Sequence, residues 1–277
     1  MKSELAGLIC QSAEDSKLSW SDQVKLGEEI GVTLREIEDI ALAQGIIPVR
    51  YQRNVQAISI KDQYSLSKSQ VAVVGCGGLG GYVIEELARL GVGSITAWDY
   101  DCFEEHNINR QLNAQLNNIG QSKTEMAAQR VKTINPVVEF IGLPHKFDEQ
   151  QGKEFLTDIQ VVIDALDNIP TRMMLAKVCH NLNIPLVHGA VGGWYGQVTT
   201  QFPGDNTLEQ LYGGVHGTQG IEAAQGILSF VPAIVASLQV AEVTKILLGR
   251  GDLLREKVMF VNLLDMEIEI MELTSTI

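Results

Sequence analysis

The sequence has little of what secreted, zinc-binding and nucleic-acid-binding proteins usually contain, and its four cysteines are the first example. Cys10, Cys76, Cys102 and Cys179 are scattered without a Cys-x-x-Cys pair, which argues against a structural zinc site and a disulfide framework. Such scattering is typical of small buried side chains in a reducing cytosol. No signal-peptide pattern is present, because Glu4 and polar residues interrupt the N-terminus. We therefore expect a cytoplasmic protein.

Basic residues are also scarce, since 21 Lys and Arg stand against 34 Asp and Glu, for a formal net charge of -13. This balance disfavours a nucleic-acid partner, because neutralising phosphates needs a basic surface. Long apolar runs are missing as well. The longest, residues 227–241, is too short and too polar to span a bilayer, so we expect no membrane partner.

Residues 1–49 differ from the rest and are predicted to form an N-terminal helical segment. Thr33-x-x-Glu36 is a capping box, and Leu34, Ile37 and Ala41 follow at helical spacing. The segment superficially resembles a helix-turn-helix, but its acidic residues outnumber its basic ones, which disfavours DNA binding. A packing, dimerisation or partner-docking role is the expectation.

From residue 70 onward, predicted strands alternate with predicted helices, which indicates a Rossmann-like, doubly wound α/β sheet that is mostly parallel. The predicted strands are 71–74, 94–98, 137–141, 161–164 and 186–189, and the predicted helices are 78–90, 123–134, 149–157 and 171–182. The period-two segments 197–202, 257–264 and 267–273 predict an antiparallel C-terminal extension. Between them lie a Gly-rich loop, residues 204–225, and an apolar helix at 233–248.

The most informative motif is a glycine-rich turn between the first strand and the first helix of this pattern. Gly75-x-Gly77-x-x-Gly80 stands in the context that a nucleotide-binding turn requires. Glycines let the backbone approach phosphate, and the helix N-terminus supplies N–H groups and partial positive charge. Asp99 ends the second predicted strand, where a carboxylate can bind ribose hydroxyls. The motif predicts a nucleotide but does not say which one.

Polar and cationic residues behind this turn favour phosphate chemistry over hydride transfer. Asp101, Asn107, Arg110 and Gln111 follow in order, and Lys123 opens the next predicted helix. A nicotinamide dehydrogenase has no need for an Arg and a Lys here. An enzyme attacking the α-phosphate of ATP does, because the transition state spreads negative charge over the phosphoryl oxygens and the departing pyrophosphate. Each residue alone could be a solvated surface group, whereas the ordered set favours a phosphate site.

A second carboxylate motif, Asp164-Ala-Leu-Asp167-Asn168, ends another predicted strand. Ligands of doubly wound sheets bind at the carboxyl ends of strands, so Asp167 is expected to face the same crevice. Its expected role is to hold Mg²⁺, which prefers carboxylate and phosphate oxygens. The alternative is that Asp167 or Asn168 caps the helix that begins near Pro170.

Arg50-Tyr51-x-Arg53-Asn54 lies before the first predicted strand, outside the Rossmann core. An Arg here would reach its own phosphate site only with difficulty, but a dimer could deliver it in trans, as an arginine finger does. The alternative is an Arg on a helix surface. The sequence leaves both readings open.

Together these motifs make the chain resemble the ubiquitin-activating-enzyme-like superfamily, and within it the ThiF/MoeB/HesA branch, over about residues 47–273. The resemblance rests on Arg-Tyr-x-Arg at 50–53, Gly-Cys-Gly-Gly-Leu-Gly at 75–80, Asp-Tyr-Asp at 99–101, Asn-x-x-Arg-Gln at 107–111, Gly-x-x-Lys at 120–123 and Asp-x-x-Asp-Asn at 164–168.

The resemblance implies an adenylyltransferase that uses ATP and Mg²⁺, as a homodimer, to activate the C-terminal Gly-Gly of a small ubiquitin-like sulfur-carrier protein. It implies a ThiF-type adenylation domain over residues 50–277, with a nucleotide-binding half near 70–170 and a carrier-binding, crossover-loop half near 171–277. Asp99 would hold the ribose, Arg110 and Lys123 with Asn107 the phosphates, Asp167 the metal, and Arg53 would reach across the dimer. The further nucleotide-binding candidates are Gly75, Gly77, Gly78, Leu79, Gly80, Asp101, Gln111 and Asn168.

The chain also departs from the family pattern. Many members bind zinc through two Cys-x-x-Cys pairs that this chain lacks, so we expect no zinc, and the crossover loop at 204–225 has no cysteine for a covalent transfer step. The extended region around residues 190–196 is expected to lie beside the incoming glycine tail. Three alternatives remain: a tRNA-modifying dehydratase that adenylates a carboxylate on a modified base, a nicotinamide dehydrogenase, and a non-catalytic ATP-binding scaffold.

Overall fold

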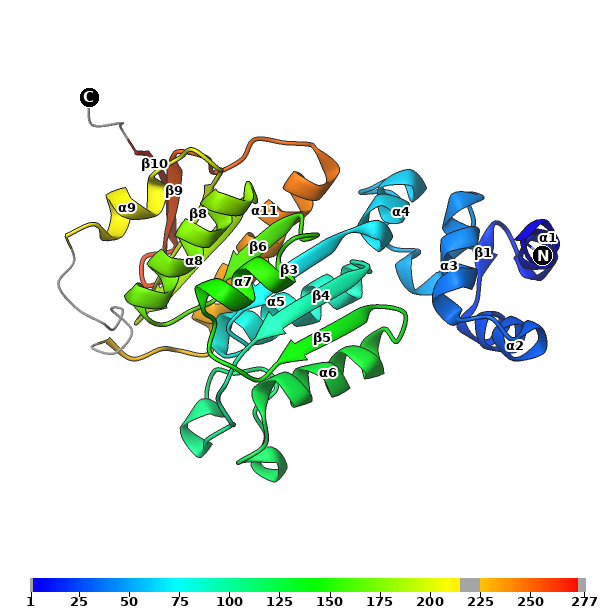
Figure 1. Cartoon of the computed structure of the whole chain (residues 1–277), viewed down its shortest axis with the longest axis horizontal. Coiled ribbons are helices and arrows are strands. Elements are labelled where there is room, and N and C mark those ends of the chain that lie inside the picture. The colour runs from blue at the N-terminus through cyan, green and yellow to red at the C-terminus, as the bar shows by residue number, and fades with distance from the viewer. Residues whose placement is uncertain (1, 215–224, 274–277) are drawn as a thin grey trace.

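The structure, a computed structural model, describes residues 2–214 and 225–273 and is organised around an eight-stranded sheet (Figure 1). The strand order is β10-β9-β8-β7-β6-β3-β4-β5. The parallel strands are β3 (Gln70–Val74), β4 (Ser94–Trp98), β5 (Glu139–Leu143), β6 (Val161–Asp164) and β7 (Leu186–Gly192). The antiparallel strands are β8 (Tyr195–Gln201), β9 (Lys257–Asn262) and β10 (Glu267–Glu272). The predicted doubly wound sheet with an antiparallel extension is confirmed.

Helices cover both faces of the parallel part of the sheet (Figure 1). One face carries α5 (Gly78–Leu90), α6 (Lys123–Ile134) and α11 (Phe230–Leu248), and the other carries α7 (Glu149–Phe155), α8 (Ile169–Leu182) and α9 (Thr207–Tyr212). In β3 the side chains of Val71 and Val73 enter the first core, whereas those of Ala72 and Val74 enter the second. This two-sided burial explains why the central strand reads as a continuous apolar run.

Several predicted boundaries differ from the structure by one to three residues, among them the starts of β5 and α11. β5 begins at Glu139 rather than at residue 137, because Asn135 and Pro136 form a turn in which the Val138 N–H donates to the Asn135 carbonyl. α11 begins at Phe230 rather than at residue 233, and Pro232 is accommodated because it lies in the first turn of the helix. By length and composition alone α11 could also cross a bilayer. In this fold it packs against β7 and β8.

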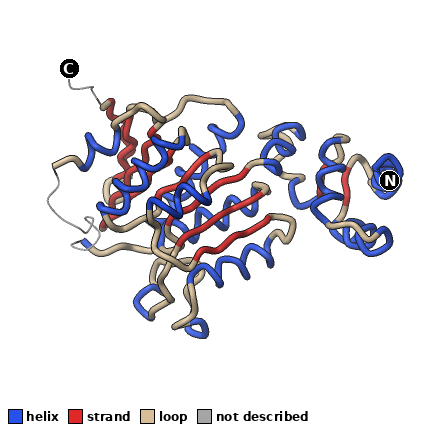
Figure 2. The backbone as a smooth tube through the Cα atoms, viewed as in Figure 1, coloured by secondary structure: helices blue, strands red, loops and turns tan. Residues whose placement is uncertain are grey.

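The N-terminal segment forms a small helical unit that projects at one end of the molecule (Figure 2). Its elements are α1 (Lys2–Ser12), α2 (Trp20–Ile30), α3 (Leu34–Ala43) and the two-residue parallel strands β1 (Lys17–Leu18) and β2 (Ile47–Pro48). The predicted capping box is present, since Thr33 accepts from the Glu36 N–H and Glu36 accepts from the Thr33 N–H. The apolar side chains at positions 9, 18, 26 and 37 form a separate core beneath these helices.

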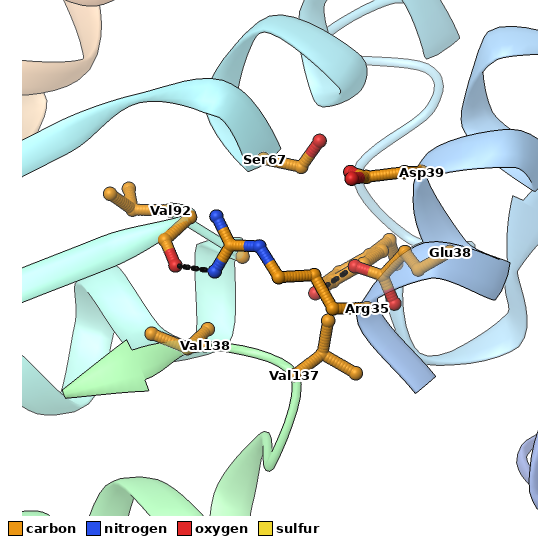
Figure 3. Close-up of a pocket in the computed structure, with 10 residues that line it drawn as sticks. Arg35, Glu38, Asp39, Ser67, Val92, Val137 and Val138 are labelled. Carbon is orange, nitrogen blue, oxygen red and sulfur yellow. Dashed lines mark hydrogen bonds between the residues drawn. The ribbon is translucent and has the colours of Figure 1, made fainter. Parts of the chain in front are cut away.

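Polar contacts fix this unit to the Rossmann body (Figure 3). Arg35 of α3 donates to the Gly93 carbonyl at 2.8 Å. The buried carboxylate of Glu38 accepts from the Tyr51 hydroxyl at 3.0 Å and pairs with Arg50. Tyr51 belongs to the 3-10 turn η1 (Val49–Tyr51), which α4 (Ile60–Lys68) follows before the sheet begins. The roles expected for residues 1–49 were packing, dimerisation and partner docking. These contacts directly support packing against the body.

Candidate active site

The predicted site residues lie at the carboxyl ends of β3, β4 and β6. The chain proceeds from β3 outward to β4 and β5, then returns to the other side of β3 with β6 and β7. The strand order therefore reverses between β3 and β6. In open α/β sheets, ligands bind in the crevice outside the strand ends at this switch point. Except for Arg53, the predicted site residues belong to the loops, strand ends or helix starts at this edge of the sheet.

The glycine loop between β3 and α5 depends on glycine at two positions. Gly75 has φ +103°, and a Cβ there would lie 2.5 Å from the Ala165 carbonyl oxygen. A Cβ on Gly80 would lie 1.7 Å from the Gly75 carbonyl oxygen, so α5 could not start so close to the strand with a larger residue. Gly77 occupies the N-cap position and has no side chain to cap the helix. The first-turn N–H groups of α5 are therefore available to an anion.

Asp99, at the end of β4, fixes this loop through main-chain hydrogen bonds. Its Oδ2 accepts from the Cys76 N–H at 2.8 Å, and its Oδ1 accepts from the Asp101 N–H at 2.9 Å. Burial raises the pKa of the Asp99 carboxyl, which the nearby Lys123 ammonium partly offsets. Each oxygen keeps further acceptor capacity, as contact with ribose hydroxyls requires. The Cys76 thiol is buried, and burial together with Asp99 raises its pKa well above the usual range.

Lys123 is the first residue of α6, and its side chain is buried at 8 % exposure. Its Nζ pairs with Asp101 Oδ2 at 3.0 Å, and its N–H donates to the Asp101 carbonyl at 3.0 Å. A lysine is seldom buried without a specific role for its charge. The ammonium lies close enough to Asp99 to affect the pKa of that carboxyl. Lys123, Asp101 and Asp99 therefore lie together at the end of β4.

Asn107 and Arg110 come from the 3-10 turn η2 (Glu105–Asn107) and the loop after it. The buried Asn107 shapes the turn, since its Oδ1 accepts from the Glu104 N–H at 3.0 Å. Arg110 Nη1 donates to the His106 carbonyl at 2.8 Å and to Asn109 Oδ1 at 2.9 Å. These bonds hold the guanidinium through one nitrogen and leave the others for a ligand.

Asp167 and Asn168, at the end of β6, differ in exposure and in hydrogen bonding. Asn168 is the N-cap of α8, and its Oδ1 accepts from the Thr171 N–H at 3.0 Å. The capping alternative therefore applies to Asn168. Asp167 is exposed, and it lies close enough to Arg110 to oppose the lowering of that guanidinium's pKa by burial. Asp167 and Arg110 are thus close enough to interact electrostatically, although they are 57 positions apart in the sequence.

Three other residues predicted to bind the nucleotide lie at or beside the start of α5. Gln111 is buried beside Gly77, and its Oε1 has no hydrogen-bond partner among the described residues. A buried polar atom of this kind marks a place where a ligand or water completes the bonding. Gly78 faces Pro232 of α11, with 3.7 Å between the position of a Cβ and the proline ring. Leu79 is buried in the core and anchors the helix rather than facing the crevice.

Arg53 is the one predicted site residue that the fold places away from the others. It is exposed and has no ion pair within residues 2–214 and 225–273. Two residues earlier, the Tyr51 ring packs against Gly91 at the C-terminal end of α5. The glycine loop lies at the opposite end of this helix, about 20 Å away at 1.5 Å per residue. Arg53 therefore lies far from the crevice of its own chain.

One polar cluster lay largely outside the sequence prediction. Beneath the loop after β6, buried Asp164 contacts Arg172 and His188 directly, and Gln197 and Tyr212 join the cluster through His188. These partners come from four other elements, and only Asp164 itself belonged to a recognised motif. Nothing in local spacing identifies the partners, because they are up to 48 residues away in sequence. The only available signal was Asp164 itself, since a carboxylate at the end of a fully buried strand needs compensating charge. The partners are Arg172, His188, Gln197 and Tyr212.

The chain matches the model of the ThiF family over residues 51–276. It is a member of the ThiF family. Among its curated relatives, the SAMP-activating enzyme E1 of Haloferax volcanii is 36% identical over 224 residues, covering 79% of this chain and 83% of that protein. The sulfur carrier protein adenylyltransferase of Thermus thermophilus is 32% identical over 215 residues, covering 73% and 78%. The predicted family and its adenylyltransferase class are confirmed.

Two further likenesses qualify this result. The tRNA threonylcarbamoyladenosine dehydratase of Bacillus subtilis is 39% identical, but only over 139 residues, or 50% of this ThiF-family chain and 55% of the dehydratase. The solved structure of E. coli MccB with ATP has a TM-score of 0.69 at 19% identity, covering 91% of this chain and 82% of MccB, which shows a shared fold. The chain spans about half the length of the combined adenylyltransferase and sulfurtransferase relatives from Zea mays and Xenopus laevis.

Proposed function

We propose that this ThiF-family protein adenylates the C-terminal glycine of a small ubiquitin-like sulfur-carrier protein in the cytoplasm. A carboxylate oxygen of the carrier attacks the α-phosphorus of ATP and forms a new P–O bond. The bond from this phosphorus to the bridging oxygen breaks, and pyrophosphate leaves with the electron pair. The attacking carboxylate is already ionised at neutral pH, so no side-chain base is needed. Positioning and charge stabilisation supply the rate.

The observation that carries this proposal is the arrangement of cations around an uncapped helix start. Lys123 is buried beside Asp101, Arg110 is held through one nitrogen, and α5 presents its first-turn N–H groups. A nicotinamide cofactor gives such cations nothing to neutralise at its reactive ring. In adenylation, by contrast, negative charge develops on the phosphoryl group and on pyrophosphate. Fixed donors such as these cations stabilise that charge without reorganisation.

Asp167 is the residue that would hold Mg²⁺. Mg²⁺ keeps several waters and is usually bound through one or two carboxylates together with nucleotide phosphates. Asp167 fits this chemistry, because it is exposed in the crevice and its hydrogen bond from Asn168 is long, at 3.4 Å. When bound, the metal would neutralise charge on the phosphates. Asp167 would supply the carboxylate ligand.

The surface at the other edge of the sheet supports a protein partner over tRNA. Every residue of the edge strand β10 is exposed, including Ile268 and Ile270 at 59% and 56%. Exposed apolar groups on an unpaired edge are a typical binding surface for another protein. Glu267, Glu269 and Glu272 stand among them and would repel a phosphate backbone. We propose this edge as the docking surface of the carrier.

A second exposed apolar patch supports a homodimer. It begins beside the glycine loop, since Pro232 of α11 contacts the position of Gly78. A second copy bound there would lie next to the nucleotide crevice, where its Arg53 could complete the cation set. The patch consists of Ile108, Trp194, Leu228, Phe230 and Ile234, each between 37% and 40% exposed.

Mixing two inactive variants tests delivery of Arg53 in trans. We expect Arg53→Ala and Lys123→Ala to be inactive alone and a 1:1 mixture to recover about a quarter of wild-type activity. Half of the randomly assembled dimers are mixed, and each mixed dimer has one intact site if Arg53 acts across the interface. ATP–pyrophosphate exchange measures the recovery. Without recovery in a mixture shown to exchange subunits, Arg53 does not act in trans.

The proposed function itself is tested by carrier-dependent ATP–pyrophosphate exchange. We expect exchange with a small ubiquitin-like protein ending in Gly-Gly and none with the same protein lacking those two residues, because the attacking carboxylate is then displaced. The same assay with tRNA in place of the carrier is the control for the dehydratase alternative. Stimulation by tRNA alone would replace this proposal, and ATP binding without exchange on any carrier would favour a scaffold.

A further inference from the structure

The polar cluster beneath the β6 loop forms a continuous chain of hydrogen bonds that starts at the end of α9. The Tyr212 hydroxyl lies 2.9 Å from His188 Nε2 and accepts from Gln197 Nε2 at 2.6 Å. His188 Nδ1 lies 2.7 Å from Asp164 Oδ2. Since a carboxylate only accepts, Nδ1 carries the proton and Nε2 accepts from Tyr212. With this assignment, each of the three bonds from α9 to β6 has one donor and one acceptor.

The chain ends on the backbone of the loop that carries Asp167. Asp164 Oδ1 accepts from the Leu166 N–H at 3.0 Å, and Arg172 Nη2 donates to the Leu166 carbonyl at 2.5 Å. Arg172 Nε also donates to Asp164 Oδ2 at 2.9 Å. Both polar groups of Leu166 are therefore held by the Asp164–Arg172 pair. The next residue in the chain is Asp167, whose exposed side chain has no comparable support of its own.

The ring of Tyr212 closes the cluster from the α9 side. The Arg172 guanidinium lies over this ring at 4.9 Å from its centroid, and the His188 ring meets it edge-on at 5.5 Å. Asp164, Arg172 and His188 are all at most 2% exposed, so these contacts are made in a low-dielectric interior. A change at Tyr212 is therefore transmitted through rigid, packed groups rather than absorbed by water.

We propose that Tyr212 and His188 are positioning residues that set the orientation of the Asp167 carboxylate through Asp164, Arg172 and the Leu166 peptide. The inference rests on the proposed function, in which Asp167 binds Mg²⁺ with ATP. It assigns a role to α9, the last described element before residue 215. Residues that orient a metal ligand without touching the metal typically change metal affinity when replaced.

Tyr212→Phe tests this role, because it removes the hydroxyl and keeps the ring against Arg172. We expect the Mg²⁺ concentration for half-maximal ATP–pyrophosphate exchange to rise about tenfold, with the rate at saturating Mg²⁺ within about twofold of the wild type. Amide hydrogen exchange over residues 165–168, measured without nucleotide, is expected to become faster. His188→Asn, which can keep a donor near the Nδ1 position, is expected to show a smaller Mg²⁺ shift.

Thr200→Val is the matched control. Thr200 also donates a buried hydroxyl to a carboxylate, Glu242 Oε2 at 2.7 Å, but that carboxylate belongs to α11, on the face of the sheet opposite to α8 and α9. The proposal predicts no Mg²⁺ shift for this variant. An unchanged Mg²⁺ dependence in Tyr212→Phe, or an equal shift in Thr200→Val, would overturn it. If the wild type shows no exchange, the proposed function fails, and hydrogen exchange at residues 165–168 then decides whether Tyr212 orders the loop.

Discussion

Lys123→Ala is expected to lower carrier-dependent ATP–pyrophosphate exchange by about 10²-fold or more, the usual effect of removing one fixed donor from a developing anion. Lys123 is buried at the start of α6 and aims its ammonium toward the end of β4. Because the Lys123 side chain is only 8% exposed, water has little access to the position that its charge would vacate. Since the charge it would stabilise develops in the transition state, the loss is expected mainly in kcat rather than in the KM for ATP.

Lys132→Ala is the matched control, because Lys132 lies on the same helix and is exposed. We expect this variant to keep wild-type exchange. A thermal unfolding scan of both variants checks that α6 remains in place. Exchange by Lys123→Ala within about threefold of the wild type would remove Lys123 from the phosphate site, because a transition-state contact contributes far more.

Arg172→Met is expected to lower the free energy of unfolding by about 3–5 kcal/mol at neutral pH, the usual cost of leaving a buried charge without its partner. Asp164 and Arg172 are 0% and 2% exposed, and Met fills a similar volume without charge. His188 remains beside the carboxylate. Burial lowers the pKa of His188 in the wild type, with the Arg172 guanidinium adding to this effect, so the ring is a poor substitute for the lost guanidinium charge.

The loss of unfolding free energy in Arg172→Met is expected to depend on pH. Burial raises the pKa of Asp164, but Arg172 and His188 outweigh it, and the pKa is lowered overall. A carboxyl with a lowered folded-state pKa contributes stability that is present above its unfolded pKa of about 3.9 and is lost as pH falls through the folded value. In Arg172→Met the carboxyl protonates more readily. The difference between variant and wild type should therefore shrink as pH falls toward 4.

Arg250→Met provides the control for the loss of an ion pair as such. Arg250 pairs with Asp62 at 2.6 Å on the surface, where the two side chains are 48% and 19% exposed. Pairs of this kind contribute about 0–1 kcal/mol. Urea unfolding of both variants at pH 7 and pH 5 measures the contrast. A loss below about 1 kcal/mol for Arg172→Met would mean that water or a rearranged side chain compensates Asp164.

The helix and strand bounds nearest the site could be read from the sequence because local signals agree there. Gly78–Leu90 and Lys123–Ile134 match their predicted ranges, since Gly91 stops the first helix and Asn135-Pro136 stops the second. Glycines at fixed offsets and a carboxylate after the next strand are also local features. The structure adds a reason for glycine at 75 and 80 that the sequence did not supply, since a Cβ at either position would clash with the protein's own backbone.

The sequence could not predict which residues from different helices and strands lie close together. Asp167 and Arg110 come close enough to interact only because β6 returns beside β3, and strand order is not encoded in spacing. The same holds for Tyr212 and His188, which meet only after β7 pairs with β8 and α9 folds back over the sheet. The glycine at 196 was expected to accompany a substrate tail. Its position also leaves room for α11, since a Cβ there would lie 2.2 Å from Val235.

The contrast between the cysteines near the glycine loop has a practical consequence for spectroscopy. Thiol reagents attack the thiolate, and the buried Cys76 with its raised pKa offers almost none. Cys10 and Cys102 are exposed, and Cys102 directly follows Asp101. A maleimide dye would therefore label the rim of the crevice without entering the nucleotide loop. After Cys10→Ser, a single fluorophore on Cys102 would be attached one residue from Asp101, the partner of Lys123. Its fluorescence would report nucleotide binding directly.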